Sequence, residues 1–159
     1  MLWLLRHADA ADGHPDEARP LTPRGFEQAR LAGLALAQLG VKPQLCLSSP
    51  KRRAAETART ACAPLGVEVR LDAALAACAY DPEQLAAGLH DVILVGHNPA
   101  ISAAVQALTG ARVRLRKGGI AAVDRGELAL LLTPRELAAV AAGTGPAADA
   151  EDSQRRARR

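Results

Sequence analysis

The stretch Leu2-Trp3-Leu4-Leu5-Arg6-His7-Ala8 decides the fold expected for this chain. The first four residues of this stretch are apolar, and they have the length and character of a strand that is buried on both faces of a parallel sheet. The strand ends abruptly in an arginine and a histidine. In an open α/β sheet, ligands bind just beyond the carboxyl ends of the strands. A cation beside an imidazole at that place suits an anionic substrate and a nucleophilic group.

Strand patterns alternate with helical patterns along the rest of the chain. Strands are predicted at residues 2–6, 44–48, 67–71 and 91–95, and an antiparallel hairpin at 120–124 and 127–132. Helices are predicted at 23–39, from Pro50 to about residue 64, at 99–108 and at 134–142, with a marginal helix at 82–89. Strands separated by helices imply a sheet covered on both faces. The expected class is therefore α/β: a three-layer αβα sandwich whose mostly parallel central sheet carries an antiparallel edge strand.

Length and composition indicate one domain with its own core. The chain has 159 residues, of which 49% are hydrophobic, and it shows no internal repeat. The domain is predicted to span residues 1–142. From 143 to 159 the chain consists mainly of Gly, Pro, Ala, Asp, Glu and Arg without periodicity, which predicts a disordered tail.

Composition and charge argue against several classes of function. Aromatic residues make up only 2%, so there is no stacking platform for single-stranded nucleic acid, and the net charge of +3 is small. Cys46, Cys62 and Cys78 form no CxxC pair, so neither a zinc site nor a disulfide framework is expected. Free thiols, with no signal peptide or transmembrane stretch, predict a cytoplasmic protein. We expect no metal, no cofactor, and no nucleic-acid or membrane partner.

Four polar fragments, each just past a predicted strand end or at a helix start, carry the chemistry. They are Arg6-His7, Leu21-Thr22-Pro23-Arg24-Gly25, Ser48-Ser49-Pro50-Lys51-Arg52-Arg53-Ala54 and Gly96-His97-Asn98-Pro99. Arg6 and Arg53 can hold phosphate oxygens through forked, charge-assisted hydrogen bonds. A neutral imidazole in line with phosphorus is a competent nucleophile, and a second, protonated imidazole stabilises charge on the transferring group. Because these cations offset the phosphate charge, the reaction needs no metal.

The fragments resemble the histidine phosphatase superfamily, and most of all its SixA-type phosphohistidine phosphatase branch. The matching motifs occur in the family's order and span most of residues 2–132: Leu5-Arg6-His7-Ala8-Asp9-Ala10; Arg19-Pro20-Leu21-Thr22 with Gly25; Ser48-Ser49-Pro50 with Arg53-Ala54 and Thr57; and Val95-Gly96-His97-Asn98-Pro99. The resemblance implies that His7 is the catalytic residue that becomes transiently phosphorylated. It also implies that Arg6, Arg53 and His97 complete the catalytic pocket and bind the phosphoryl group.

Two positions depart from the family pattern. Ala8 stands where glycine is commoner, a tolerated variant. Larger relatives carry a glutamate proton donor after the third strand, but residues 71–79 hold no carboxylate where the resemblance calls for one, and Asp9, Asp72 and Asp81 are the substitutes. A phosphoramidate such as phosphohistidine has a nitrogen leaving group that departs readily once protonated, so it depends less on a strong acid. The missing glutamate and the lack of an insert for a lid favour this substrate.

The sequence therefore predicts a metal-independent phosphatase that acts through a covalent phosphohistidine intermediate. Its preferred substrate is phosphohistidine on a protein, for instance a phosphorelay component. Two alternatives stay open: a phosphatase for small phosphate monoesters, and a catalytically weak phosphoprotein-binding module. Asn98 and Arg24 are additional candidates for substrate binding. The basic run at 112–117 is typical of a solvated surface, although it also suits an acidic partner.

Overall fold

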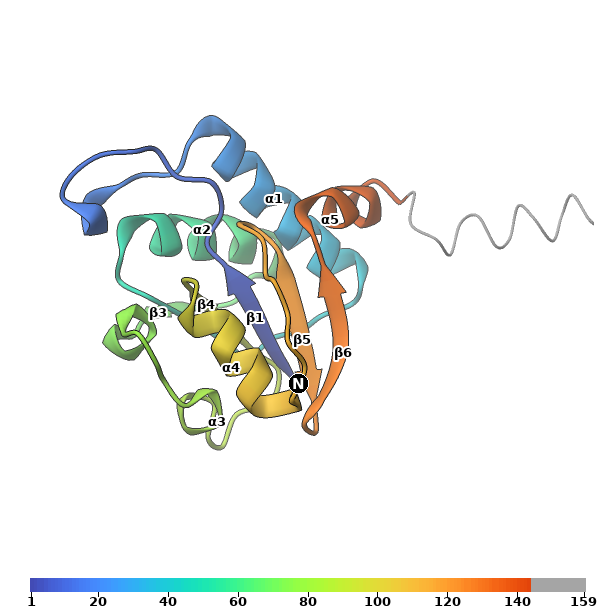
Figure 1. Ribbon diagram of the computed structural model, residues 1–159. Helices are drawn as coiled ribbons and strands as arrows, with labels where there is room; N and C mark the ends of the chain where they lie inside the picture. Colours follow the sequence, from blue (N-terminus) through green and yellow to red (C-terminus); the bar gives the residue numbers. More distant parts are fainter. Residues whose placement is uncertain (144–159) are drawn as a thin grey trace, which may run out of the picture.

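The computed structural model describes residues 1–143, which form a six-stranded sheet with helices on both faces (Figure 1). The elements in chain order, with η for short 3-10 helices, are β1 (Leu2–Arg6), η1 (Asp16–Ala18), α1 (Pro23–Gln38), β2 (Leu45–Ser48), α2 (Arg52–Cys62), η2 (Ala63–Leu65), β3 (Val69–Leu71), η3 (Ala73–Ala76), α3 (Pro82–Leu85), β4 (Val92–Gly96), α4 (Ala100–Thr109), β5 (Ile120–Asp124), β6 (Glu127–Leu132) and α5 (Pro134–Ala141).

The sheet has the strand order β3-β2-β4-β1-β5-β6. The strands from β3 to β1 are parallel, whereas β5 pairs antiparallel with both β1 and β6. The predicted α/β class with a mostly parallel sheet is confirmed. The antiparallel strand is β5, which lies one position inside the edge, and the edge strand β6 runs in the same direction as β1.

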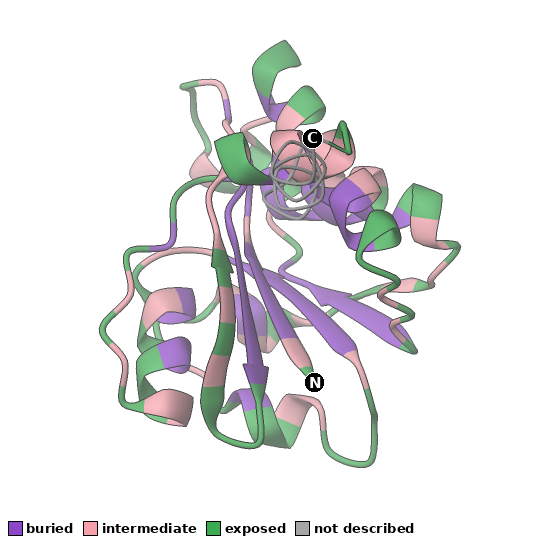
Figure 2. Cartoon of the chain, turned by 90° about the vertical axis from the view of Figure 1, so that its right-hand side faces the viewer, coloured by how far each residue is buried: buried purple, intermediate pink, exposed green. Residues whose placement is uncertain are grey.

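Helices cover both faces of the sheet because successive residues of a strand point to opposite sides. Trp3 and Leu5 of β1 pack on the face covered by α1, α2 and α5, in a cluster with Leu36 of α1. Leu4, which lies between them, points to the other face and packs against Ile101 of α4. Figure 2 shows the inner strands as the buried centre of the molecule, whereas residues of the edge strand β6 are exposed or intermediate. The predicted three layers follow from this alternation.

The start of α1 lies close to the segment that follows β1. The Thr22 hydroxyl accepts a hydrogen bond from the Gly25 N–H and caps the helix, as the sequence predicts. At Gly25 the helix approaches the Asp9 backbone so closely that any Cβ would overlap the Asp9 carbonyl. Glycine at this position therefore lets the helix pack directly beside the functional edge of the sheet.

Several helix boundaries differ from the prediction by one residue, and those of α2 and α3 differ by more. α2 begins at Arg52 rather than Pro50, because Lys51 is still outside the helical region and its N–H is hydrogen-bonded to a side chain of the preceding turn. α3 ends at Leu85 and does not continue to residue 89. Gly88 has a φ of 76°, which interrupts any continuation of the helix.

The tail predicted at 143–159 lies, apart from Gly143, outside the described residues. Between residues 1 and 143, no helix combines the length and the apolar character needed to cross a bilayer.

Candidate active site

The pairing of β1 with β4 brings the two histidines of the predicted motifs together. Arg6 pairs with Gly96 in the parallel register, so the next residue of each strand is a histidine. The His7 N–H donates to the Gly96 carbonyl, and the imidazole centroids of His7 and His97 lie 5.0 Å apart. β2 flanks β4 on its other side and delivers Ser49 to the same edge. The carboxyl ends of three neighbouring strands thus meet at one site.

The His7 imidazole is held in one tautomer. Its Nδ1 lies 2.8 Å from the carbonyl oxygen of Ala8, which can only accept, so Nδ1 carries the proton and donates it. The Nε2 lone pair is then left for another partner. Burial lowers the pKa of His7 to about 4, with further lowering by the positive charges of Arg53 and Arg6. The imidazole is therefore neutral at neutral pH.

His97 is also neutral at neutral pH. Its Nε2 lies 2.8 Å from the Ser49 hydroxyl, and burial, followed by the charges of His7 and Arg53, lowers its pKa to about 3. The sequence led us to expect a protonated imidazole here. The difference arises because His97 is buried and also lies near the cations Arg53 and Lys51, which the spacing of the motifs alone does not reveal.

Arg6 and Arg53 each use part of their guanidinium group to bind the protein. Arg6 donates from Nη1 to the Leu115 carbonyl over 2.9 Å, and burial lowers its pKa. Arg53, only 6% exposed, donates from Nη1 and Nη2 to Asp16. The Nε atoms of both arginines are buried and have no hydrogen-bond partner among the described residues. Both side chains are thus oriented by one end and retain an unpaired donor.

Asp16, in η1, positions Arg53 and is missing from the sequence prediction. Its backbone carbonyl and its carboxylate accept hydrogen bonds of 2.6 and 3.0 Å from Arg53. The carboxylate also binds Lys51 at 3.1 Å and Arg19 at 3.0 Å. The hydrogen bonds from Arg53, then Lys51 and Arg19, hold the pKa of Asp16 far below its usual range. The loop at 9–21 contains several acidic residues, and no local pattern singles out this one.

Of the two additional binding candidates, Asn98 directly follows His97 in the chain and Arg24 lies at the start of α1. Asn98 donates to the Leu115 carbonyl over 3.2 Å and accepts from Ser102, so its amide holds neighbouring backbone in place. Arg24 lines a cavity that it shares with Arg6. Neither residue has a hydrogen bond to His7 or His97 among the described contacts.

The three carboxylates that the sequence offers as substitute proton donors are each engaged by other groups of the protein. Burial alone would raise the pKa of Asp9, but hydrogen bonds from Thr22 and Lys117 outweigh it and lower the value. Asp72 and Asp81 accept backbone N–H groups at the starts of η3 and α3. In the part of the chain that the structure describes, no group of three or more His, Cys, Asp or Glu side chains is arranged to hold a metal ion.

Comparisons with known proteins agree with this geometry. The profile of the histidine phosphatase superfamily (branch 1) matches residues 2–86. An uncharacterized protein of Picosynechococcus sp. is 33% identical over 161 aligned residues, which cover 86% of this chain and 98% of that protein. The fold is similar to that of SixA from Agrobacterium tumefaciens (TM-score 0.75, 27% identity, 84% and 97% of the two chains). It is also similar to the protein histidine phosphatase SixA complexed with tungstate (TM-score 0.76, 25% identity, 86% and 98%).

Proposed function

Because the chain belongs to the histidine phosphatase superfamily and is a phosphatase of the SixA type, we propose that it hydrolyses phosphohistidine on a protein. The proposed reaction passes through a covalent phosphohistidine at His7.

Three unpaired buried nitrogens carry this proposal. They are Nε of Arg6, Nε of Arg53 and Nδ1 of His97, none of which has a hydrogen-bond partner among residues 1–143. A buried donor without a partner costs about 1–3 kcal/mol. One ligand bound next to His7 would offer partners to all three nitrogens and remove this cost. A phosphoryl group offers three oxygens to these donors. The tungstate bound by SixA is an oxyanion of the same tetrahedral shape.

The Ser49 hydroxyl supports a donor role for His97. Its oxygen accepts from the Lys51 N–H at 3.3 Å, and in the tautomer that we propose its proton is donated to Nε2 of His97 over 2.8 Å. The remaining proton of the neutral ring is then on Nδ1, the unpaired atom. A phosphoryl dianion between the two arginines places an opposite charge beside this ring. That charge raises the pKa of His97 and favours a protonated imidazole when the transition state forms.

In the first step, the Nε2 lone pair of His7 attacks phosphorus while the bond from phosphorus to the substrate nitrogen breaks. The Nδ1–H of His7 keeps its proton and donates a hydrogen bond to the Ala8 carbonyl, which fixes the ring in line with the substrate. Arg6 and Arg53 neutralise charge on the equatorial oxygens. In the second step, water attacks phosphorus, the phosphorus–Nε2 bond breaks and returns its electron pair to Nε2, and inorganic phosphate leaves as H2PO4⁻ with both protons of the water.

The leaving group distinguishes phosphohistidine from a phosphate monoester. An imidazole that is protonated on the substrate leaves as a neutral ring, whereas a sugar alkoxide needs a proton from the enzyme. Asp9 is ionised, and Asp72 and Asp81 are engaged as helix caps. A site without a strong general acid therefore favours the phosphoramidate.

A comparison of substrates tests the proposal. We expect kcat/KM for a phosphohistidine protein to exceed that for sugar phosphates by about a hundredfold, the effect of one absent general acid. If a sugar phosphate or another small monoester is the better substrate, the proposed specificity is wrong. Asp9→Asn would then be slow on that monoester, because Asp9 would have to supply the proton.

A further inference from the structure

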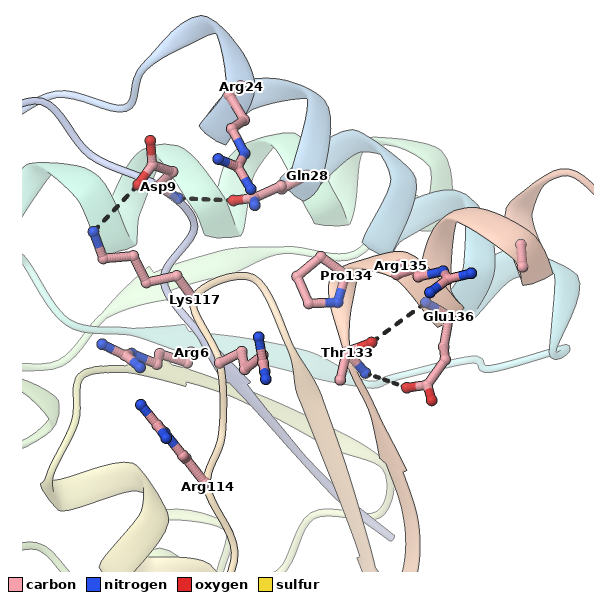
Figure 3. A pocket seen from close by; sticks show the side chains of 12 residues that line it. Arg6, Asp9, Arg24, Gln28, Arg114, Lys117, Thr133, Pro134, Arg135 and Glu136 are labelled. Carbon is pink, nitrogen blue, oxygen red and sulfur yellow. Dashed lines mark hydrogen bonds and ion pairs between the residues drawn. The ribbon is translucent and has the colours of Figure 1, made fainter.

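A cavity of about 860 Å³ is lined in part by Arg6 (Figure 3). Neither His7 nor His97 is among its lining residues. Six cationic side chains line it: Arg6, Arg24, Arg114, Arg116, Lys117 and Arg135. They come from four parts of the chain, namely the end of β1, the start of α1, the segment before β5 and the start of α5. The fold, rather than a single basic run in the sequence, therefore assembles this cationic surface.

The two carboxylates in the cavity wall do not balance these charges. Asp9 is engaged by the Thr22 hydroxyl and by Lys117, at 3.0 and 3.2 Å. Glu136 accepts a hydrogen bond from the Thr133 N–H in the capping box of α5. For Arg24, Arg114, Arg116 and Arg135, no hydrogen bond or ion pair joins the guanidinium group to another side chain within residues 1–143, and all four are exposed. The cavity thus presents four exposed guanidinium groups to solvent without a direct ion pair, although the charge of Arg24 acts on Asp9 and that of Arg135 on Glu136.

Leu115 connects the basic segment at 112–117 to the active site at the carboxyl edge of the sheet. Its side chain is only 1% exposed, whereas Arg114 and Arg116 on either side are exposed. Its carbonyl accepts hydrogen bonds from both Arg6 and Asn98. A group bound by Arg114 or Arg116 would therefore lie next to the phosphoryl group that Arg6 holds.

We infer that this cavity binds carboxylate side chains flanking the phosphohistidine of the substrate protein, an inference that rests on the proposed function. Pockets for small molecules are mostly apolar and enclose their ligand. Here ten of the twelve lining residues are polar or charged, and only Pro134 and Ala139 are apolar. Exposed arginines suit carboxylates on a protein surface, since they pair with them in forked geometry and steer the encounter.

Two phosphohistidine peptides test the inference. They are identical except that the residues flanking the phosphohistidine are Glu in one peptide and Gln in the other. We expect wild-type kcat/KM to favour the Glu peptide by about tenfold at low ionic strength, and 0.5 M salt to remove most of this preference. Arg114→Ala and Arg135→Ala should each reduce the preference by about threefold. Phosphoramidate, which has no flanks, should be hydrolysed as before, and this reports on folding and chemistry.

Matched controls separate the cavity from total charge. Arg112→Ala removes an exposed arginine from the same segment, and Arg59→Ala removes one from α2; neither lines the cavity. Both should keep the preference for Glu. A charge reversal, Arg135→Glu, places an acid in the first turn of α5, where it suits the helix dipole, and should turn the preference toward a peptide with Lys flanks. Equal losses in cavity and control variants would overturn the inference.

Other outcomes are also decisive. If a small bisphosphate outcompetes the Glu peptide and loses its advantage in Arg114→Ala, the cavity takes a small anion and the inference is wrong. If neither peptide is hydrolysed, the proposed function fails, and the cavity is tested by inhibition of p-nitrophenyl phosphate hydrolysis. Stronger inhibition by an unphosphorylated Glu peptide than by its Gln counterpart, lost in Arg135→Ala, would then support carboxylate binding. Equal inhibition would contradict it.

Discussion

Replacing His7 by glutamine should make the stability of the protein less sensitive to acid. Burial lowers the pKa of His7 from 6.5 to about 4, so the unfolded chain binds a proton between these values that the folded protein does not. The native state therefore loses stability as the pH falls from about 6.5 toward about 4. For a single group with these two pKa values, the loss is about 2 kcal/mol at pH 5 and close to zero at pH 7.5.

Urea unfolding of wild type and His7→Gln at pH 7.5 and pH 5 measures this effect. The free energy of unfolding of the wild type should fall more between these pH values, by about 2 kcal/mol relative to the variant. His97 is present in both proteins, so most of its own contribution cancels. His90→Gln, which removes an exposed imidazole, is the control. Parallel pH dependences for wild type and His7→Gln would refute the argument that His7 is a neutral, desolvated nucleophile.

Three further predictions follow from other contacts at the site. Asp16→Asn keeps the hydrogen bond from Arg53 to the backbone carbonyl of residue 16 but removes the carboxylate charge. In steady-state kinetics, kcat/KM should fall about tenfold, because Arg53 is less well positioned. The free energy of unfolding in urea should change by less than about 1 kcal/mol, because the Asp16 side chain is half exposed. Unchanged kcat/KM would mean that the carboxylate does not position Arg53. Gly25→Ala should lower stability by about 1–3 kcal/mol through overlap with the Asp9 carbonyl, and an unchanged thermal midpoint would contradict that close contact. Activity should survive treatment with a chelator. Orthovanadate should inhibit the enzyme, because it can adopt a trigonal bipyramidal geometry at the attacking imidazole. A strict requirement for magnesium or zinc would contradict the argument that arginines neutralise the phosphoryl charge.

Local patterns were sufficient for most of the fold. The bounds of β1, β5 and β6 agree with the prediction because apolar residues and turns mark them clearly. Arg125 and Gly126 both have positive φ, as the predicted tight hairpin turn requires. The start of α2 was misplaced because proline is compatible with both a turn and a first helical residue, and only the Ser49 contact to the next N–H decides between them.

The histidine and arginine motifs were found from sequence because each follows a strand or begins a helix. The contacts between these motifs were not predicted, because they join side chains that are far apart in the chain. Asp16 and Arg53 are 37 positions apart and meet only after the loop folds over α2. The basic cavity likewise requires α5 to lie near the segment at 112–117, so the sequence showed a charged run without its function.

Detection of the phosphorylated enzyme tests the central claim most directly. Wild-type protein mixed briefly with a phosphohistidine substrate, quenched under alkaline conditions and digested, should show one acid-labile phosphate on the peptide containing His7 by mass spectrometry. His7→Ala should show neither this peptide nor turnover, while its far-UV circular dichroism stays that of the wild type. Full turnover by His7→Ala, or a phosphate that forms and decays at the catalytic rate on another residue, would contradict the mechanism.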